Sequence, residues 1–460
     1  MGVFADSSRS GTAGPRMQRM ERTVGYASNS GVQIAYEVLG SGERDFVLVL
    51  EWATSLDFVA EHESMAFFQN RLAELGRVIR FDLRGTGLSE RVDQMPPLEE
   101  WVDDLRAVLA AVGSESAILV GHGHAAQLCM LFAAMYPDRT EALIIVNGFA
   151  RLSRAPDYAF GYPPNARARM SESVRASWGT GQTVAWTAPT FAAKPGGLEF
   201  LARSERASCT PNRAAKTLAS VFAVDVRDIL PSISAPTLVM HGASDPFVSP
   251  EHGQYLAEHI HGARYVERPS IDHAFFATDD SDPWMGPIEE FLDAPKRVAP
   301  PTRSLMTIAF TDIVDSTQTA SELGDAEWRR LLERHQALAR QYVERASGRV
   351  VKFTGDGMMA TFDGPARAIE CLRDLGNRLD DVGLPIRSGV HTGEVELLGD
   401  DIGGIGVHIA ARVASKASAR EIFVSSTVRD LVAGSGLEFT DQGPQELKGV
   451  PGTWQLLSVK

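Results

Sequence analysis

The hydrophobic pattern of residues 46–268 alternates between short apolar runs and longer amphipathic stretches. Runs of five to seven residues predict strands, and several lack polar residues, which is typical of parallel strands covered on both faces. The predicted strands are Phe46–Trp52, Arg77–Asp82, Ser116–Gly121, Glu141–Asn147, Pro236–His241 and Arg264–Arg268. Helical periodicity lies between them, in Trp101–Val112, His124–Met135 and Pro250–Ile260. This alternation predicts an α/β domain with a mostly parallel sheet.

The alternation stops in two places. Residues from about 149 to 230 are rich in Ala, Arg, Ser and Trp, which predicts a helical cap over the sheet's C-terminal edge. Residues 294–302 contain three prolines and little apolar content, which predicts an extended linker. We therefore expect a loose tail at 1–24, an α/β domain at 25–293 and a second domain at 303–460.

The second domain has a different order of elements. The predicted strands are Leu305–Thr311, two short strands within Arg349–Phe362, Ile386–Leu397 and Glu421–Ser425; the predicted helices are Ala326–Ala346, Pro365–Leu379 and Gly404–Lys416. This pattern predicts a mixed α+β domain of roughly ferredoxin-like order.

Composition narrows the range of partners. The chain has 460 residues with 59 acidic and 45 basic side chains, a formal net charge of −14, which disfavours bulk binding to nucleic acid or an anionic membrane. A small polyphosphate remains compatible, because metal ions neutralise it locally. The three cysteines are far apart, which predicts buried thiols in a reducing cytoplasm. Two histidines and two glycines interrupt the longest apolar stretch, Ala117–Tyr136, so we expect no membrane span.

Three ordered motifs mark the first domain. Phe81–Ser89 reads FDLRGTGLS, His241–Pro246 reads HGASDP, and His273 follows Asp272. These segments resemble the D-x-R-G-x-G-x-S turn, the acid segment and the histidine segment of α/β-hydrolases over residues 25–293. The resemblance implies that Asp245 and His273 occupy the positions of the catalytic acid and base.

The nucleophile of such an enzyme belongs on a G-x-S-x-G turn between a strand and a helix. Here the turn reads Gly121–Ala125, GHGHA, which places Gly123 where the serine belongs, and Glu51 stands where hydrolases usually place His-Gly. Acid and base without a nucleophile form no acyl-enzyme. We favour a vestigial site of Gly123, Asp245 and His273 in a binding or regulatory module that closes over a small apolar ligand. The alternative is a hydrolase that uses His122 or His124 as an unusual nucleophile.

Two carboxylates stand out in the second domain. Asp312 follows an apolar strand and precedes a helix, and Asp356 lies between two glycines. A carboxylate at a strand end holds a divalent ion, while backbone N–H groups at a helix start accept phosphate oxygens. Each signal alone is weak, but together the two acids predict a site for two metal ions.

Five ordered motifs within residues 303–460 resemble the catalytic domain of class III nucleotidyl cyclases. They are FTDIVDST at Phe310–Thr317, KFTGDG at Lys352–Gly357, DIGG at Asp401–Gly404, VHIAAR at Val407–Arg412 and LKG at Leu447–Gly449. A hydrolase-like domain followed by such a domain resembles bacterial hydrolase–cyclase fusion proteins.

The resemblance implies a role for each matching residue. Asp312 and Asp356 would hold two Mg²⁺ or Mn²⁺ ions, and Arg412 would neutralise charge on the α-phosphate. Lys352 would donate to adenine N1 and Asp401 would accept from its N6 amino group, a pair that fits ATP and mismatches GTP. The family also implies a homodimer, with active sites at the interface.

One position departs from the family pattern. His408 stands where an asparagine usually orients the ribose, and it lies four residues before Arg412 on one helix face. We expect an adenylate cyclase that makes 3′,5′-cyclic AMP and pyrophosphate. Two alternatives remain: a bifunctional esterase and cyclase, and a nucleotide-binding regulator that His408 has disabled.

Overall fold

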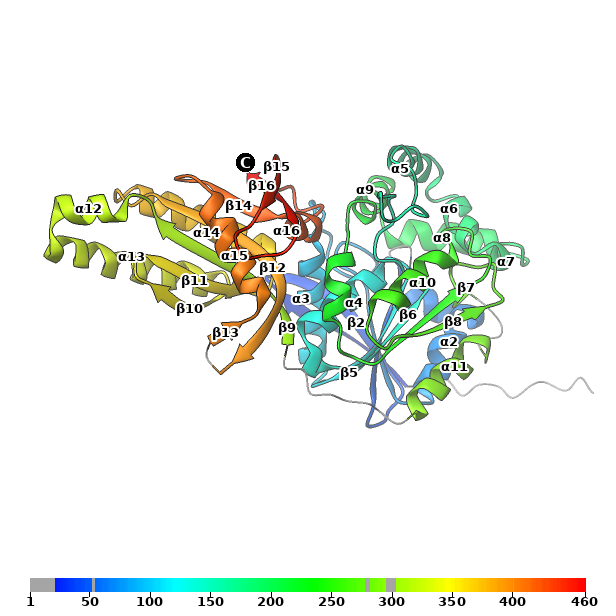
Figure 1. Ribbon diagram of the computed structural model, residues 1–460. Helices are drawn as coiled ribbons and strands as arrows, with labels where there is room; N and C mark the ends of the chain where they lie inside the picture. Colours follow the sequence, from blue (N-terminus) through cyan, green and yellow to red (C-terminus); the bar gives the residue numbers. More distant parts are fainter. Residues whose placement is uncertain (1–20, 52–53, 278–281, 295–302, 400) are drawn as a thin grey trace, which may run out of the picture.

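The computed structural model describes residues 21–51, 54–277, 282–294, 303–399 and 401–460. The structure contains two sheets of eight strands each, one in each domain (Figure 1). The two domains touch near β9, the first strand of the second sheet. The predicted linker at 294–302 and most of the predicted tail lie outside the described residues.

The first sheet is mostly parallel, in the order β1-β2-β4-β3-β5-β6-β7-β8. Its antiparallel pairs are β1–β2 and β2–β4, so β2 alone runs opposite to the other strands. The strands are β1 (Arg22–Asn29), β2 (Val32–Leu39), β3 (Asp45–Val49), β4 (Arg77–Phe81), β5 (Ala117–His122), β6 (Thr140–Val146), β7 (Thr237–Gly242) and β8 (Arg264–Arg268).

Helices cover both faces of this sheet. In β5, Ile118 and Val120 belong to a core with helices α2 and α11, whereas Leu119 belongs to the core with α3 and α4. Alternate residues of a strand point to opposite faces, so an unbroken apolar run satisfies both cores. The helices are α1 (Leu56–Glu61), α2 (Glu63–Ala73), α3 (Leu98–Ala111), α4 (Ala125–Met135), α10 (Pro250–His259) and α11 (Asp282–Asp293).

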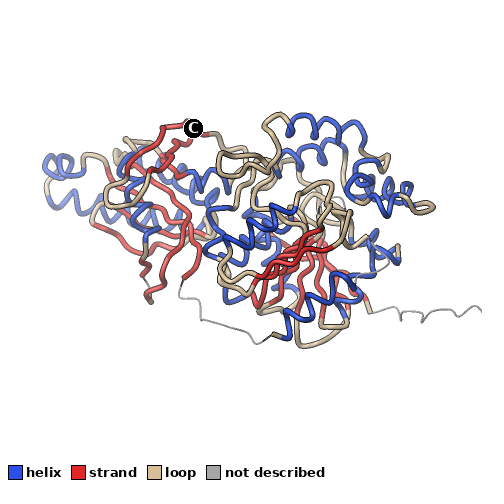
Figure 2. The backbone as a smooth tube through the Cα atoms, turned by 45° about the vertical axis from the view of Figure 1, so that its right-hand side comes forward, coloured by secondary structure: helices blue, strands red, loops and turns tan. Residues whose placement is uncertain are grey.

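Five helices between β6 and β7 form a layer over one end of the sheet (Figures 1 and 2). They are α5 (Ala166–Ser177), α6 (Gln182–Thr187), α7 (Pro189–Ala192), α8 (Gly197–Ser208) and α9 (Pro211–Val221). Phe149, Val174 and Trp178 are buried in a separate apolar cluster of this layer. The helices therefore enclose space above the carboxyl ends of the parallel strands, where ligands bind in α/β folds.

The edge hairpin corrects the predicted tail. Residues 22–24 were assigned to a loose tail, but they form the start of β1, which pairs with β2 from Arg22↔Leu39 to Asn29↔Val32. Ser30 and Gly31 both have positive φ, 51° and 84°, as in a two-residue hairpin turn. Both strands carry mixed polar and apolar residues, so no apolar run predicted them.

The second sheet has the order β10-β11-β9-β12-β14-β16-β15, and β13 pairs with β12. Its strands are β9 (Arg303–Ile313), β10 (Arg349–Thr354), β11 (Gly357–Phe362), β12 (Ile386–Leu398), β13 (Asp401–Gly403), β14 (Ile422–Ser425), β15 (Phe439–Glu446) and β16 (Thr453–Val459). Its helices are α12 (Ser316–Leu323), α13 (Asp325–Arg345), α14 (Pro365–Asp380), α15 (Ile405–Lys416) and α16 (Ser426–Leu431).

The two faces of this sheet carry different partners. Val343 of α13 and Leu372 of α14 share a buried core with Ala309 of β9. Ala410 of α15 shares a second, smaller core with Ile308 of β9 on the other face. Because strand residues alternate, the side chain of Asp312 lies on the face of α15.

Apolar side chains join the two sheets' layers. Leu305 at the start of β9 and Leu431 of α16 lie in the same buried cluster as Leu131 of α4. Leu131, Leu305 and Leu431 also line one small void. The second domain is thus packed onto the helix that follows Gly123.

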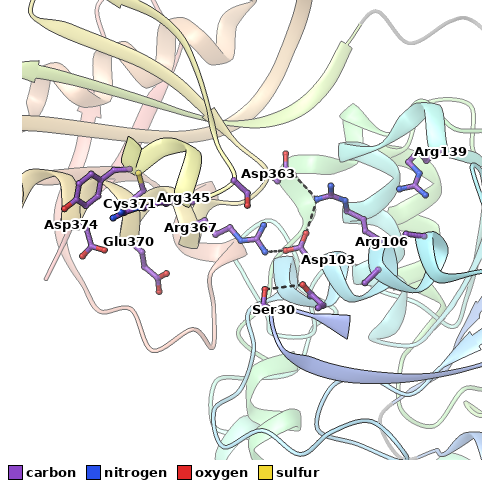
Figure 3. A pocket seen from close by; sticks show the side chains of 16 residues that line it. Ser30, Asp103, Arg106, Arg139, Arg345, Asp363, Arg367, Glu370, Cys371 and Asp374 are labelled. Atoms are coloured by element: carbon purple, nitrogen blue, oxygen red, sulfur yellow. Dashed lines mark hydrogen bonds and ion pairs between the residues drawn. The ribbon is translucent and has the colours of Figure 1, made fainter. Parts of the chain in front are cut away.

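Charged side chains surround this apolar contact (Figure 3). Arg106 of α3 pairs with Asp363 at 2.9 Å, and Asp103 of α3 pairs with Arg367 of α14. The carboxylate of Glu99 accepts hydrogen bonds from the backbone N–H groups of Ala366 (3.1 Å) and Arg367 (3.3 Å) in the first turn of α14. A polar cavity of about 700 Å³ lies beside these pairs. Helix α3 therefore positions α14 directly.

Among the described residues, no helix is both long enough and apolar enough to cross a bilayer.

Candidate functional site

Asp312 lies near the end of β9, beside the hairpin that carries Asp356. Strand β11 pairs with β9 from Met358↔Thr311, so the hairpin turn lies next to Asp312. A Cβ atom added to Gly357 would lie 3.8 Å from Oδ1 of Asp312. Arg387 donates to Oδ2 of the same carboxylate, with Nε at 3.0 Å. The Asp312 carboxylate therefore lies next to the hairpin turn that carries Asp356, with Oδ1 of Asp312 turned toward the hairpin.

This pair fits divalent metal ions by the chemistry of its donors. Carboxylate oxygens are the ligands that Mg²⁺ and Mn²⁺ prefer, and Mg²⁺ sites commonly use only one or two carboxylates together with substrate phosphates. The described residues contain no group of three or more His, Cys, Asp or Glu side chains placed to hold a metal. Asp312 and Asp356 thus suit metal ions that arrive with a polyphosphate.

The predicted base-reading residues meet in space. Lys352 of β10 donates from Nζ to Oδ2 of Asp401 of β13 at 2.6 Å, and each side chain is 47% exposed. The hydrogen bond from Lys352 lowers the pKa of Asp401. The two residues are 49 positions apart in sequence, so only the fold brings this donor and acceptor side by side.

Arg412 and His408 lie exposed on α15. Nε of Arg412 donates to the backbone carbonyl of Lys448 at 3.0 Å, so the Leu447–Gly449 motif fixes the base of this side chain. Among the described residues, no hydrogen bond or ion pair joins Asp312 or Asp356 to the Lys352 group or to Arg412. Asp356 lies four residues after Lys352, in the turn between β10 and β11.

The turn after β5 keeps the shape of a nucleophile turn. Gly123 has a φ of 56°, and its backbone N–H donates to the carbonyl of Val146 at 3.1 Å. Helix α4 begins two residues later, at Ala125. The left-handed backbone of such a turn normally pushes the nucleophile out of the sheet. In this chain the turn has the left-handed backbone, but Gly123 has no side chain that could act as the nucleophile.

The carboxylate of Glu51 fills the space that a nucleophile side chain would take. A Cβ atom added to Gly123 would lie 1.9 Å from Oε1 of Glu51. The same Oε1 accepts from the backbone N–H of His124 at 3.2 Å and lies 3.2 Å from Nε2 of His273. The Glu51 carboxylate therefore occupies the space of a nucleophile side chain. It also accepts the hydrogen bond of the His124 N–H, the group that would bind an oxyanion.

Asp245 and His273 form the predicted pair. Nδ1 of His273 lies 2.7 Å from Oδ2 of Asp245, and Oδ1 of Asp245 accepts from the N–H groups of Phe247 and Val248. Burial opposes a charge on His273, but the carboxylates of Asp245 and Glu51 outweigh burial and raise its pKa to about 10. His273 is therefore an imidazolium at neutral pH, held between two carboxylates.

Neither histidine of the turn is placed as a nucleophile. Nε2 of His122 lies 2.8 Å from the backbone carbonyl of His273, and His122 is 1% exposed. Nδ1 of His124 lies 3.4 Å from Oε1 of Glu51. Burial, together with the charge of His273, lowers the pKa of His122 to about 4. Both side chains support the Glu51–His273 pair instead.

A cavity of about 260 Å³ opens between Glu51 and the cap helices. Its walls are Met170, Ser173, Val174, Ser177, Gln182, Thr183, Val184, Trp186, Thr187, Leu218 and Phe247. Phe247 packs edge-on against His273, with ring centroids 5.0 Å apart. The buried charges thus face a mostly apolar chamber.

Glu51 is the residue whose role the sequence interpretation missed. From the sequence, we noted only that Glu51 stands where hydrolases usually place His-Gly. An acidic side chain at the end of a buried strand, in a chain that lacks the nucleophile, is the available signal, because a buried carboxylate needs a partner. That partner, His273, lies 222 positions away.

The chain belongs to the alpha/beta hydrolase family, whose model matches residues 51–294, more than half of the chain. A second family model, the adenylate and guanylate cyclase catalytic domain, matches residues 298–458. The predicted fold class and the order of the fusion are confirmed, and the chain carries a cyclase catalytic domain.

Individual relatives divide between the two domains. A pimeloyl-(acyl-carrier protein) methyl ester esterase of Neisseria meningitidis serogroup C is 27% identical over 179 residues, which are 38% of this chain and 70% of that protein. Karrikin insensitive 2 receptor CA of Petunia hybrida is 25% identical over 245 residues, 51% of this chain and 87% of that protein. A Rhizobium meliloti protein named as an adenylate cyclase is 29% identical over 134 residues, 27% of this chain and only 22% of that protein.

Proposed function

We propose that the protein is a cytoplasmic adenylate cyclase that converts ATP to 3′,5′-cyclic AMP and pyrophosphate. The observation that carries the choice of ATP is the Lys352–Asp401 pair, a cationic donor and an anionic acceptor 2.6 Å apart. Adenine presents an acceptor at N1 and a donor at N6, which this pair complements. Guanine presents the reverse, so GTP bound in the same orientation would leave these two polar side chains without partners.

The remaining side chains account for the chemistry. Asp312 and Asp356 would hold divalent ions, which when bound lower the pKa of the ribose 3′-hydroxyl and neutralise the leaving pyrophosphate. Arg412 supplies positive charge to the α-phosphate as negative charge develops there. Orientation of one nucleotide contributes much of the rest, since attack within a single molecule needs no second partner.

A homodimer is supported by the lack, among the described residues, of any hydrogen bond or ion pair between Arg412 and either Asp312 or Asp356. The carboxylates of one protomer would face the base-reading pair and Arg412 of the other, and a two-fold axis then creates two equivalent sites. Asp312 lies on the sheet face of α15, the helix that carries Arg412. The hydrolase-like layer packs at the opposite end of β9, around Leu305.

The test is a side-by-side assay of purified protein with ATP and GTP, in Mg²⁺ and in Mn²⁺. We expect cyclic AMP as the main product, and loss of all cyclisation in Asp312→Ala. The double variant Lys352→Glu with Asp401→Cys should shift preference toward GTP. The matched control, Arg378→Glu with Asp381→Cys, changes an exposed pair on the surface of α14 and should leave selectivity unchanged.

Three results would reject parts of the proposal. Activity that persists in Asp312→Ala rejects the metal role, and unchanged selectivity in the Lys352/Asp401 variant rejects the base-reading role. ATP binding without a cyclic product would favour the nucleotide-binding regulator, and recovery in His408→Asn would explain it.

For the hydrolase-like domain we propose a catalytically silent, ligand-binding regulatory role. Gly123 supplies no nucleophile, and the Glu51 carboxylate fills the space that a nucleophile side chain would need. Hydrolysis of a p-nitrophenyl ester by the full chain tests this role. Turnover that disappears in His273→Ala would overturn it and favour the bifunctional enzyme.

A further inference from the structure

The floor of the cap cavity carries an uncompensated negative charge. Glu51 and Asp245 are two carboxylates, and His273 between them is one imidazolium. Burial alone would raise the pKa of Glu51, but the charge of His273 and the hydrogen bond from His124 hold it well below its usual range. The buried group therefore has one negative charge in excess.

Two neighbouring histidines, His122 and His241, do not cancel this charge. Burial, with the charge of His273, lowers the pKa of His122 to about 4, and burial lowers the pKa of His241 as well. Both side chains are therefore neutral at physiological pH. In each ring Nε2 lies within hydrogen-bond distance of a backbone carbonyl, that of His273 for His122 and that of Val248 for His241.

The two carboxylate oxygens of Glu51 differ in their contacts. All three hydrogen-bond contacts of its carboxylate among the described residues, with His124 twice and with His273, use Oε1. Its side chain is 13% exposed and lines the cavity. Oε2 is thus the acceptor that a ligand in the cavity can reach.

The cavity walls supply apolar and aromatic surface but no positive charge. Glu51 is the only charged residue among the described residues that line the cavity. Trp186 and Phe247 pack edge to face with ring centroids 5.6 Å apart, and Trp186 is 46% exposed. Aromatic faces attract organic cations, and a carboxylate removed from water attracts them strongly.

We propose that the cap cavity is a binding site for a small organic ammonium ion with a short apolar tail. The ammonium would donate to Oε2 of Glu51, and the tail would lie between Trp186, Phe247 and the aliphatic walls. The proposal rests on the proposed role of this domain as a ligand-binding module, and it names the class of ligand. Carboxylic acids are excluded by charge. An ester carbonyl is excluded because Oε1 of Glu51 already accepts the N–H of His124.

The test measures binding of three probes with the same six-carbon tail: hexylammonium, hexanol and hexanoate. Isothermal titration uses the full chain without nucleotide or metal, so a failure of the cyclase assignment leaves this result intact. We expect hexylammonium to bind the wild type at least tenfold more tightly than hexanol, and hexanoate to bind more weakly than hexanol. In Glu51→Gln, hexylammonium should lose at least tenfold and hexanoate should gain.

Two further variants separate charge from folding. Glu51→Asp keeps the charge on a shorter side chain and should retain the preference for hexylammonium over hexanoate with reduced affinity. Glu43→Gln removes an exposed carboxylate outside the cavity and should leave all three affinities unchanged. Equal binding of hexylammonium and hexanol by the wild type, an unchanged Glu51→Gln variant, or no binding of any probe would each overturn the proposal.

Discussion

At the scale of single residues, the missing side chain at Gly123 and the position of the Glu51 carboxylate depend on each other. Gly123 keeps the left-handed backbone that a nucleophile turn requires, and the missing side chain leaves room for the Glu51 carboxylate. Restoring a serine at position 123 would therefore restore the residue type but not the space around it.

The first prediction follows from this overlap. Gly123→Ser should lower stability by about 1–3 kcal/mol, the usual cost of forcing atoms into a filled site, and should not hydrolyse esters. Gly123→Ser combined with Glu51→Gly removes the overlap and should hydrolyse p-nitrophenyl butyrate at least tenfold faster than Gly123→Ser alone. Thermal melting and initial rates measure the two effects. Ester hydrolysis by the single Gly123→Ser variant would contradict the role of Glu51.

The second prediction concerns the charge of His273. Its pKa in the folded chain, about 10, lies above its ordinary value of 6.5. A raised pKa means that the ion pairs stabilise the fold fully below pH 6.5, and that this contribution is lost as pH rises toward 10. An NMR titration of the His273 ring should therefore show a midpoint near pH 10. The Glu51→Gln substitution should lower this midpoint, because it removes one of the two carboxylates beside the ring. A wild-type midpoint near 6.5 would refute the buried ion pair.

At the scale of elements, α14 begins without a capping side chain of its own. Its N-cap residue, Gly364, has no side chain, and a Cβ atom there would lie 2.2 Å from Oε2 of Glu99. Glu99 of α3 instead accepts the first N–H groups of α14, 267 positions away in sequence. The hydrolase-like domain thus supplies the cap of a cyclase-domain helix.

Removal of this carboxylate gives the third prediction. Glu99→Ala should lower the free energy of unfolding by about 0.5–2 kcal/mol, the usual effect of losing a cap, because two backbone donors lose their acceptor. Glu370→Ala, on the exposed side of α14, is the control and should change stability by less than about 0.5 kcal/mol. Equal effects of the two substitutions in urea unfolding would contradict the cap.

The elements that the sequence predicted are those with strong apolar patterns. Strand β5 and helix α4 were predicted within one residue at each end, because both are almost wholly apolar. Strands β1 and β15 at sheet edges were missed, and so were the interior strands β2 and β16. All four mix polar and apolar residues, and apolar periodicity reports only burial.

The candidate sites divide in the same way. Lys352 and Asp401 were selected from motifs, and the structure places them in contact. Neither Glu51 nor Glu99 was assigned a role, because each acts through a partner more than 70 positions away that no local pattern links to it. Motifs identify chemistry that families share, whereas substitutions that fill a vacated site appear only in three dimensions.

At the scale of the whole molecule, one helix and one strand connect the two sites. Helix α4 starts beside His124, which touches Glu51, and its eleven residues span about 16 Å before Leu131 and Met135 meet Leu305. Strand β9 then runs from Leu305 to Asp312. A change at the floor of the cap cavity therefore has a packed route to the Asp312 carboxylate.

The central claim is a cyclase site shared between two copies of the chain, and mixing of two inactive variants tests it most directly. Asp312→Ala removes one half-site and Arg412→Ala removes the other, so each variant alone should make no cyclic AMP. In an equal mixture half of the dimers are mixed, and each mixed dimer holds one intact site of two, so we predict about a quarter of wild-type activity. A mixture as inactive as its components, under conditions where subunits exchange, would contradict the account.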